Sequence, residues 1–311
     1  MHHPDIPDKN FTEPGNMSCP GCGASIAMNL ALKALGQDTI LVIPACCWAI
    51  IAGPYPISSL KVPVLHTAFA SAAVTASGVR AGLNMKGDTK TTVVAWAGDG
   101  GTFDIGLQSL SGAAERNDDI IFVCYDNEAY MNTGVQRSSS TPYGTRTTTT
   151  PGQAWKNTRK KNIMDIMAAH RIPYAATANI AYPNDFMEKF KKAGAMGGGT
   201  RFLHVFASCT TGWGAPSEYG VKIARLATQT NIFPLYEIEN GTQVVLNESG
   251  SRPVEEYLDI QGRFKHLQKH QITQIQYQVN ADFSRLKSRA DAACPPREQA
   301  SRDSHISMHL S

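Results

Sequence analysis

The 311-residue sequence carries little net charge and few charged residues for its length. Its 29 Lys and Arg residues nearly balance its 26 Asp and Glu residues, which leaves a net charge of +3. Such a balance gives no reason to expect a nucleic acid or an anionic membrane as the main partner. Because 18% of the residues are charged and 42% are hydrophobic, the composition excludes global disorder and supplies a sizeable core.

Signals for export and for membrane insertion are also missing. The start, MHHPDIPDKNF, has neither the basic region nor the apolar region of a secretory signal, so we expect a cytoplasmic protein. The apolar stretch over residues 39–57 is broken by Pro44, Gly53, Pro54 and Pro56, which favours a buried strand and a turn over a membrane span. The seven cysteines are odd in number and unevenly spread, which fits an extracellular disulfide framework poorly.

Short apolar runs alternate with longer Ala-rich stretches from about residue 24 to residue 240. This pattern predicts an α/β fold with a doubly wound, mostly parallel sheet, in which ligands bind where loops leave the carboxyl ends of strands. The expected strands are Thr39–Ile43, Thr92–Trp96, Asp119–Tyr125, Pro173–Thr177, Phe202–Phe206 and Pro234–Ile238. The expected helices are Ala24–Leu35, Ala68–Met85, Asp104–Arg116, Asn162–His170, Asn184–Ala193 and Ser217–Thr228.

Two stretches depart from this rhythm. Residues 127–161, called the long loop below, are rich in Thr, Ser, Gly and Arg; because they follow a predicted strand, we interpret them as a functional loop. The rhythm stops beyond Gly241, and residues 254–291 are polar and Gln-rich. We therefore expect one domain over residues 1–240 and an extension over residues 241–311, with either a helical arm or a solvated tail.

The first chemical signal is the strand exit VVAWAGDGGTFDIG, in which Asp99 stands between Gly98 and Gly100. Asn127 follows the next strand, and its side chain and the Asp99 carboxylate are the oxygen ligands that Mg²⁺ prefers near phosphates. GDG alone is a generic turn, but in this context it resembles the diphosphate-binding motif of thiamine-diphosphate enzymes. Phe103 occupies a position where a GxGxxG fingerprint needs Gly, and no GK[ST] follows for a P-loop.

The second signal is the CxxC formed by Cys19 and Cys22. This motif alone is compatible with zinc, a redox disulfide or an iron–sulfur cluster. Further soft ligands are available at Cys46 or Cys47 and at Cys209, which all lie just past predicted strand ends at the same sheet edge. The remaining two cysteines are more simply interpreted as structural or incidental thiols. They are Cys124 and Cys294.

The motifs together resemble the β subunit of the 2-oxoacid:ferredoxin oxidoreductases over residues 13–240. Their order is CPGCG, a Cys before PYP, GDGGTFDIG, DNEAYMNTGVQRSSSTP, SCTTGWG and FPLYEIENG. The resemblance implies a thiamine-diphosphate domain with a 4Fe–4S cluster close to the cofactor. Because the family's third cysteine precedes PYP by seven residues, it implies Cys47 rather than Cys46, although PACC replaces the usual ATGC. The implied cluster ligands are Cys19, Cys22, Cys47 and Cys209.

Carried over position by position, the resemblance implies Mg²⁺ binding by Asp99, Asn127 and the carbonyl of Ala129. It implies a catalytic Asn132 beside the reacting carbon, where its amide could stabilise an oxyanion; without the motif, Asn132 would be interpreted as a turn residue. His66 is placed near the cofactor, with a helix-start histidine as the alternative. The other implied cofactor contacts are Cys47, Gly98, Gly100, Gly101, Thr102 and Thr133.

The implied activity is the oxidative decarboxylation of a small 2-oxoacid, with electrons passed through the cluster to ferredoxin. GDGGTFDIG and YMNTG resemble the pyruvate-type branch, in which coenzyme A takes the acyl group. PACC and Arg146 make oxalate a comparable hypothesis. Two alternatives stay open: a cluster-free thiamine-dependent decarboxylase subunit, and a zinc-stapled, non-catalytic assembly subunit.

The sequence also predicts partner chains. A thiamine enzyme needs a second domain against the aminopyrimidine, and no second run of βα units follows residue 241. We therefore expect a hetero-oligomer with a pyrimidine-half (α-type) chain at the active site. The resemblance adds a γ-type chain and a ferredoxin-like chain that carries clusters.

Overall fold

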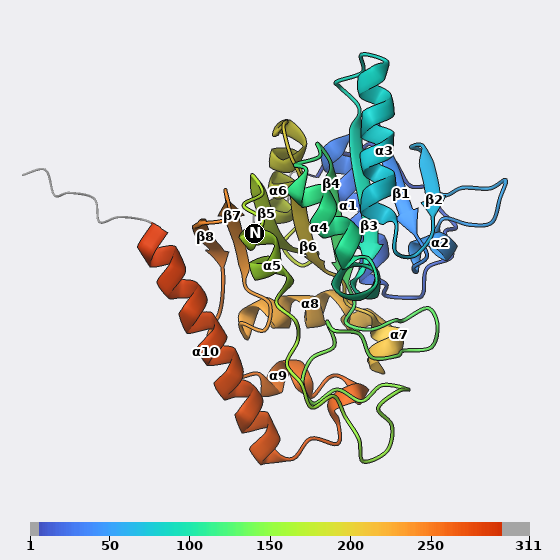
Figure 1. Cartoon of the computed structure of the whole chain (residues 1–311). Coiled ribbons are helices and arrows are strands. Elements are labelled where there is room, and N and C mark those ends of the chain that lie inside the picture. Colours follow the sequence, from blue (N-terminus) through green and yellow to red (C-terminus); the bar gives the residue numbers. More distant parts are fainter. Residues whose placement is uncertain (1–5, 294–311) are drawn as a thin grey trace, which may run out of the picture.

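The computed structural model describes residues 6–293 and contains one eight-stranded sheet in the order β2-β1-β3-β4-β6-β5-β7-β8 (Figure 1). The first six strands in this order are parallel, and β7 and β8 are antiparallel to their neighbours. The predicted α/β fold with a mostly parallel sheet is thus confirmed. The strands are β1 (Thr39–Pro44), β2 (Val64–Thr67), β3 (Thr92–Gly98), β4 (Ile121–Asp126), β5 (Tyr174–Asn179), β6 (Arg201–Phe206), β7 (Leu235–Glu239) and β8 (Gln243–Glu248).

Helices cover both faces of the sheet. On one face α1 (Gly23–Leu35), α6 (Pro183–Ala195) and α8 (Gly220–Gln229) contribute to one buried cluster. The other face is covered by α3 (Ala72–Met85), α4 (Leu107–Glu115) and α5 (Ile163–Ala169). Since side chains alternate along a strand, Val94 and Trp96 of β3 join the first cluster, whereas Val93 and Ala95 join the second. Strands buried on both faces are continuous apolar runs, which is why the sequence reveals them.

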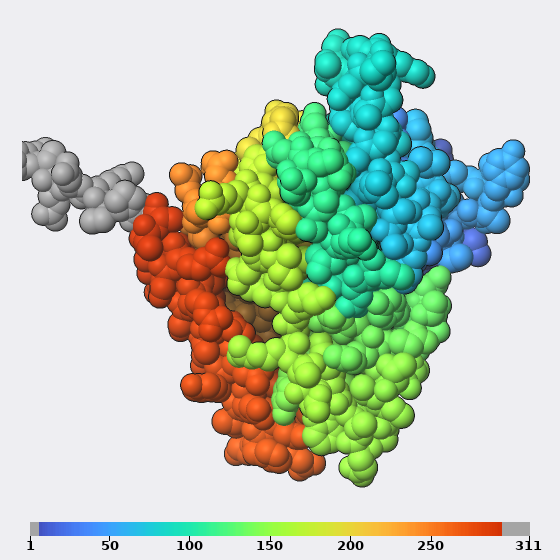
Figure 2. Space-filling model, viewed as in Figure 1, coloured from blue at the N-terminus to red at the C-terminus, as the bar shows by residue number. Residues whose placement is uncertain are grey.

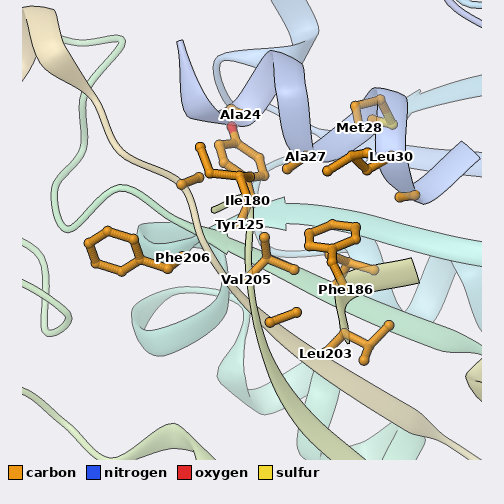
Figure 3. Close-up of a cluster of buried hydrophobic side chains, with 14 of the residues drawn as sticks. Ala24, Ala27, Met28, Leu30, Tyr125, Ile180, Phe186, Leu203, Val205 and Phe206 are labelled. Carbon is orange, nitrogen blue, oxygen red and sulfur yellow. The ribbon is translucent and has the colours of Figure 1, made fainter. Parts of the chain in front are cut away.

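The core beneath α1 shows how small side chains set the packing distance. Ala24 and Ala27 of α1 are fully buried beside Tyr125 and Val205 of the sheet (Figure 3). Gly23, at the start of α1, donates its N–H to the carbonyl of Ser208 at 2.9 Å. This contact joins the CxxC segment to the loop that follows β6.

Two strands were not predicted, and the sheet extends beyond the boundary expected at residue 240. β2 is a short edge strand with Leu65 44% exposed, and β8 pairs only with β7. Edge strands carry polar and exposed residues, so neither has a buried apolar run. The boundary expected at residue 240 falls in the turn between β7 and β8, and the sheet continues to Glu248.

The helical arm expected after the domain is α10 (Lys269–Ala293), which lies along the side of this chain's own sheet (Figure 1). Ile275 and Leu286 of α10 are buried, and Leu286 belongs to the core of the second face. Arg289 is ion-paired with Asp165 of α5 at 2.5 Å. Figure 2 shows α10 in red along one side, with a hollow next to it.

The remaining short elements lie in the connections. They are α2 (Trp48–Ile51), the π-helical turn η1 (Gly100–Asp104), α7 (Thr210–Trp213), η2 (Ser217–Tyr219), α9 (Glu255–Leu258) and η3 (Gly262–Phe264). The long loop joins β4 to α5. None of the helices in residues 6–293 is both long and apolar enough to span a membrane.

Candidate functional site

The parallel strands end together, which gathers the predicted ligands at one edge of the sheet. Asp99 directly follows β3 and Asn127 directly follows β4, and these two strands are neighbours. Cys47 follows the end of β1, and Cys209 follows the end of β6. β2 lies on one side of β1 and β3 lies on the other. The direction in which successive strands are added to the sheet therefore reverses between β1 and β3. The carboxyl ends of strands at such a reversal form the ligand crevice of doubly wound sheets.

Three of the residues predicted to bind Mg²⁺ converge. One atom of the Asn127 side-chain amide lies 3.0 Å from Asp99 Oδ1 and 3.0 Å from the carbonyl oxygen of Ala129. If this atom is nitrogen, it donates a hydrogen bond to both oxygens. If it is oxygen, its distance to each of the other two oxygens is close to the roughly 2.9 Å that separates adjacent ligands in an octahedron with 2.0–2.1 Å bonds. These two distances are compatible with a shared Mg²⁺.

The electrostatics of Asp99 also favour a cation. Its carboxylate is 1% exposed and accepts a hydrogen bond from Ser138 Oγ at 2.5 Å. Burial raises the pKa of Asp99 well above its usual range, and the negative charge of nearby Asp126 raises it further. A bound divalent cation would remove this penalty and keep the carboxylate ionised.

Behind Asp99 lies a network that sequence reasoning missed. The buried Asp126 carboxylate lies 2.6 Å from Lys160 Nζ and 2.8 Å from His204 Nε2, and it accepts a hydrogen bond from Ser140 at 2.7 Å. Burial opposes ionisation, but Lys160 and His204 together hold the pKa of Asp126 below its ordinary range. Burial lowers the pKa of His204, so we assign a neutral ring that donates from Nε2.

The glycines of GDGG allow close packing of aromatic side chains. A Cβ at Gly100 would overlap the ring of Tyr130, and a Cβ at Gly101 would lie 3.3 Å from the ring of Phe69. Thr102 donates from Oγ1 to the carbonyl of Gly98 at 2.8 Å. The backbone here forms η1, and the first N–H groups of such a turn have no acceptor within the turn. These N–H groups are available to an anion such as a diphosphate.

The segment predicted to meet the substrate lies between the two candidate sites. Asn132 and Thr133 are exposed on a turn of the long loop. The preceding Met131 fills the space beside Gly212, because a Cβ there would overlap its sulfur. His66 is exposed on the edge strand β2, at the carboxyl end where the other residues gather. The roles of these residues stay predictions.

The cysteine side chains come close to one another at the same edge. Burial and the neighbouring thiols, which include Cys209 and Cys22, together raise the pKa of Cys47 to about 12. Burial, with smaller contributions from Cys22 and Cys19, likewise raises the pKa of Cys209 to about 11. Each of these pairs interacts only if the sulfurs are near one another. Cys46 differs, since Tyr125 and backbone N–H groups are the polar groups that act on it. This arrangement favours Cys47 as the ligand.

The thiols do not form a single-ion site. In the part of the chain that the structure describes, no three His, Cys, Asp or Glu side chains are close enough to share one metal ion. A tetrahedral zinc site needs four ligands at about 2.0–2.3 Å from one atom. Cys124 is fully buried in β4, as expected for a structural thiol, and Cys294 lies outside the described residues.

A cavity of about 370 Å³ lies between α10, the long loop and α5, in the region of the hollow seen in Figure 2. Two ion pairs lie in its lining. Arg289 lies 2.5 Å from Asp165, and Arg159 lies 3.5 Å from Asp282.

Comparisons with known proteins agree with this geometry. Residues 51–205 match the family described as thiamine pyrophosphate enzyme, C-terminal TPP binding domain. The 2-oxoglutarate:ferredoxin oxidoreductase of Magnetococcus marinus, solved with 2-oxoglutarate, coenzyme A and succinyl-CoA bound, superposes with a TM-score of 0.56 and 24% identity. The match covers 67% of this chain and 70% of that one, and it shows the fold. The chain thus contains a thiamine-diphosphate-binding domain.

Two relatives define the family more narrowly. The ketoisovalerate oxidoreductase subunit VorB of Pyrococcus horikoshii is 50% identical over 295 residues, covering 91% of this chain and 94% of the relative. The pyruvate synthase subunit PorB of Methanothermobacter marburgensis is 49% identical over 286 residues, covering 91% and 99%. The chain belongs to the β subunits of the 2-oxoacid:ferredoxin oxidoreductases.

Proposed function

We propose that this chain is the catalytic β subunit of an enzyme that decarboxylates a small 2-oxoacid and passes the electrons to ferredoxin. The observation that carries the proposal is the presence of two donor sets, three oxygens and four thiols, at one sheet edge. Thiamine diphosphate bound there would supply a nucleophilic carbon and an electron sink, and a 4Fe–4S cluster would accept single electrons. The proposed cluster ligands are Cys19, Cys22, Cys47 and Cys209.

Residues of this chain would orient the cofactor and the reacting atoms. Asp99, Asn127 and the Ala129 carbonyl would hold Mg²⁺, and the free N–H groups of η1 would bind the diphosphate. The Asn132 amide would donate a hydrogen bond to the oxygen of the substrate's 2-oxo group as negative charge develops there. Its turn is held beside the Cys209 loop by the contact of Met131 with Gly212.

The exposed surface supports the proposal that a partner chain completes the active site. Tyr55 is 98% exposed and Ile57 is 70% exposed in the connection between α2 and β2. Leu65 is 44% exposed on the uncovered edge strand β2, at the outer end of the sheet in Figure 1. Large apolar side chains gathered at an open edge are typical of an interface. We propose the pyrimidine-half chain as the partner here; the γ-type chain, the ferredoxin-like chain and the cytoplasmic location stay predictions.

Sequence identity does not select the substrate. Relatives named for ketoisovalerate and for pyruvate are 50% and 49% identical to this chain, and neither name supports oxalate. Product analysis with each 2-oxoacid decides among the hypotheses. Pyruvate would give acetyl-coenzyme A, ketoisovalerate would give the branched acyl-coenzyme A, and oxalate would give CO₂ alone.

The test is anaerobic expression of the chain with and without its partner chains. We expect brown protein with a broad absorption that reductant bleaches, and 2-oxoacid-dependent dye reduction that needs the partners. Colourless protein that contains zinc would instead favour the assembly subunit. Cluster-free protein with decarboxylase activity would favour the cluster-free alternative. Full activity of the chain alone would contradict the proposal that a partner chain completes the active site.

A further inference from the structure

Arg263 lies between the loop that carries the candidate Mg²⁺ ligands and the loop that carries Cys209. Its Nη2 donates to Glu128 Oε2 at 2.6 Å, and its Cζ lies 3.9 Å from the centroid of the Trp213 ring. Arg263 is 7% exposed and Glu128 is 1% exposed. A buried charge pair of this kind is costly to assemble and costly to break. Stability alone therefore does not explain why an arginine is buried at this position.

On the oxygen side, Glu128 is the residue between Asn127 and Ala129. Its φ of +66° lies in the left-handed region, which is sterically unfavourable for a residue other than Gly. The Glu128 side chain is held by Arg263 and, at 3.1 Å, by Lys160. Holding Glu128 in this conformation fixes the peptide units that aim the Asn127 side chain and the Ala129 carbonyl at their meeting point.

On the thiol side, Trp213 ends α7, the short helix that Cys209 caps. The Trp213 backbone N–H donates to the Cys209 carbonyl at 2.9 Å, and its indole N–H donates to the Asn127 carbonyl at 2.9 Å. The Cys209 sulfur accepts from the Gly212 N–H at 3.4 Å. The ring that Arg263 covers is thus bonded to both loops.

Two glycines bring the C-terminal segment close enough for these contacts. Gly262 donates its N–H to the carbonyl of Gly214 at 3.3 Å, and a Cβ on Gly262 would lie 3.1 Å from that oxygen. Gly214 has a φ of +62°, which glycine adopts without strain. Arg263 follows directly, so its side chain enters between the two loops.

We propose that Arg263 is a positioning residue that couples the two sites: it holds the Mg²⁺ ligands in register and places a positive charge beside Cys209. This inference rests on the proposed function. Arg263 touches neither the metal ligands' oxygens nor the sulfurs in the contacts above, and it acts through Glu128 and Trp213. Planar Arg suits both tasks, since one face stacks on an indole while the edge binds a carboxylate.

The experiment compares four variants of the complete complex with the unchanged enzyme. The variants are Arg263→Met, Arg263→Lys, the double variant Glu128→Gln/Arg263→Met, and the control Arg252→Met. Arg252 forms an exposed pair with Glu256 in the same C-terminal segment and takes part in none of the contacts described above. Two quantities are measured: the Mg²⁺ dissociation constant at fixed thiamine diphosphate, and the midpoint potential of the cluster by EPR-monitored titration.

We expect Arg263→Met to weaken Mg²⁺ binding about 10- to 100-fold, as for other residues that orient metal ligands. We also expect a lower cluster potential, because a nearby positive charge favours the reduced cluster. Adding Glu128→Gln removes the stranded carboxylate, so Mg²⁺ affinity recovers in part while the potential stays low. Arg263→Lys keeps the positive charge but loses the planar guanidinium that stacks on Trp213 and binds Glu128. We expect at least about threefold weaker Mg²⁺ binding and a nearly unchanged cluster potential.

Several outcomes overturn the inference. If Arg263→Met lowers the melting temperature but leaves the Mg²⁺ affinity and the potential as in Arg252→Met, the arginine is only structural. If Arg263→Met does not assemble, Arg263→Lys decides, and unchanged Mg²⁺ affinity sinks the proposal. If the unchanged enzyme lacks a cluster signal or Mg²⁺-dependent cofactor binding, the proposed function fails and the inference fails with it. If the unchanged enzyme shows both and the Arg263 variants change neither the Mg²⁺ affinity nor the cluster potential, only the inference about Arg263 is rejected.

Discussion

At one sheet edge, the Asn127 amide lies 3.0 Å from two oxygens, while the four thiols nearby surround no common point for a single ion. The oxygen site is deeply buried and braced by hydrogen bonds from Ser138 and by the Asp126 network. The thiol site is more open, and Cys19 is exposed. We therefore expect the oxygen site to be formed by the folded chain alone. The thiol site would be completed only when an iron–sulfur cluster binds to it.

The spacing of the donors matters here more than their chemical type. An Asn127 amide atom 3.0 Å from two other oxygens suits one small ion with short bonds. Four thiols spread over the loops after β1 and β6 and the segment before α1 suit a larger group that bridges them. If this comparison is right, damage to one site leaves the other largely intact.

The largest effect on stability is expected from the network behind the oxygen site. Asp126→Asn removes the buried partner of Lys160 and His204, so we expect a loss of roughly 3–5 kcal/mol in the free energy of unfolding. The matched control is Asp282→Asn, which breaks an exposed pair with Arg159 and should cost about 0–1 kcal/mol. Thermal and urea unfolding measure both. Equal losses would show that the oxygen site is not preassembled by this network.

Asp99→Asn is expected to separate the two sites. Loss of a charged ligand should weaken Mg²⁺ binding by at least about 100-fold, the upper end for residues that only support a ligand. Iron content should not change, because Asp99 is not among the groups that act on the four thiols. Mg²⁺ titration and iron analysis measure the two effects, with Asp282→Asn as the control. Loss of iron in Asp99→Asn would break the comparison.

The pH dependence of Mg²⁺ binding follows from the raised pKa of Asp99. Between the ordinary pKa of an aspartate and this raised value, the metal-free fold keeps a proton that the unfolded chain has lost. The metal-free fold therefore loses stability as the pH rises through that window, and Mg²⁺ must displace the proton. We expect Mg²⁺ affinity to increase with pH by up to about tenfold per pH unit. A dissociation constant that stays flat from about pH 5 to about pH 8 would contradict the assignment.

The smallest effect is expected at the hydrogen bond that ties the CxxC segment to the Cys209 loop. Thr210 donates from Oγ1 to the Pro20 carbonyl at 3.0 Å, and Thr210→Val should cost about 1 kcal/mol. We expect iron to leave roughly fivefold faster in the presence of a chelator. The control is Thr211→Val, which changes an exposed neighbour. Equal rates in the two variants would mean that the cluster, once bound, needs no help from this contact.

Much of the fold was predictable from the sequence because its central strands are buried on both faces. The strand exits at Asp99 and Asn127 were predictable for the same reason, since they follow such runs. β2 and β8 were not, because edge strands have no apolar signature. A residue that directly follows a strand lies at the edge of the sheet where that strand ends. The position of the candidate site at this edge could therefore be predicted from the sequence.

The contacts that brace the site could not be predicted. Lys160 lies near the end of the long loop and Arg263 lies in the polar C-terminal segment, and neither belongs to a periodic pattern or a motif. Both meet Glu128, and Arg263 does so across 135 positions of sequence. Such pairings depend on the complete fold, and a single sequence contains no local signal for them.

The central claim is tested most directly by the iron content of Cys46→Ser and Cys47→Ser, prepared anaerobically as complete complexes. We predict that Cys47→Ser loses the 4Fe–4S EPR signal and 2-oxoacid-dependent dye reduction, while Cys46→Ser keeps both. Mg²⁺-dependent thiamine diphosphate binding should persist in both variants. Loss of iron from the Cys46 variant alone, or one zinc ion in place of iron in the unchanged protein, would contradict the account.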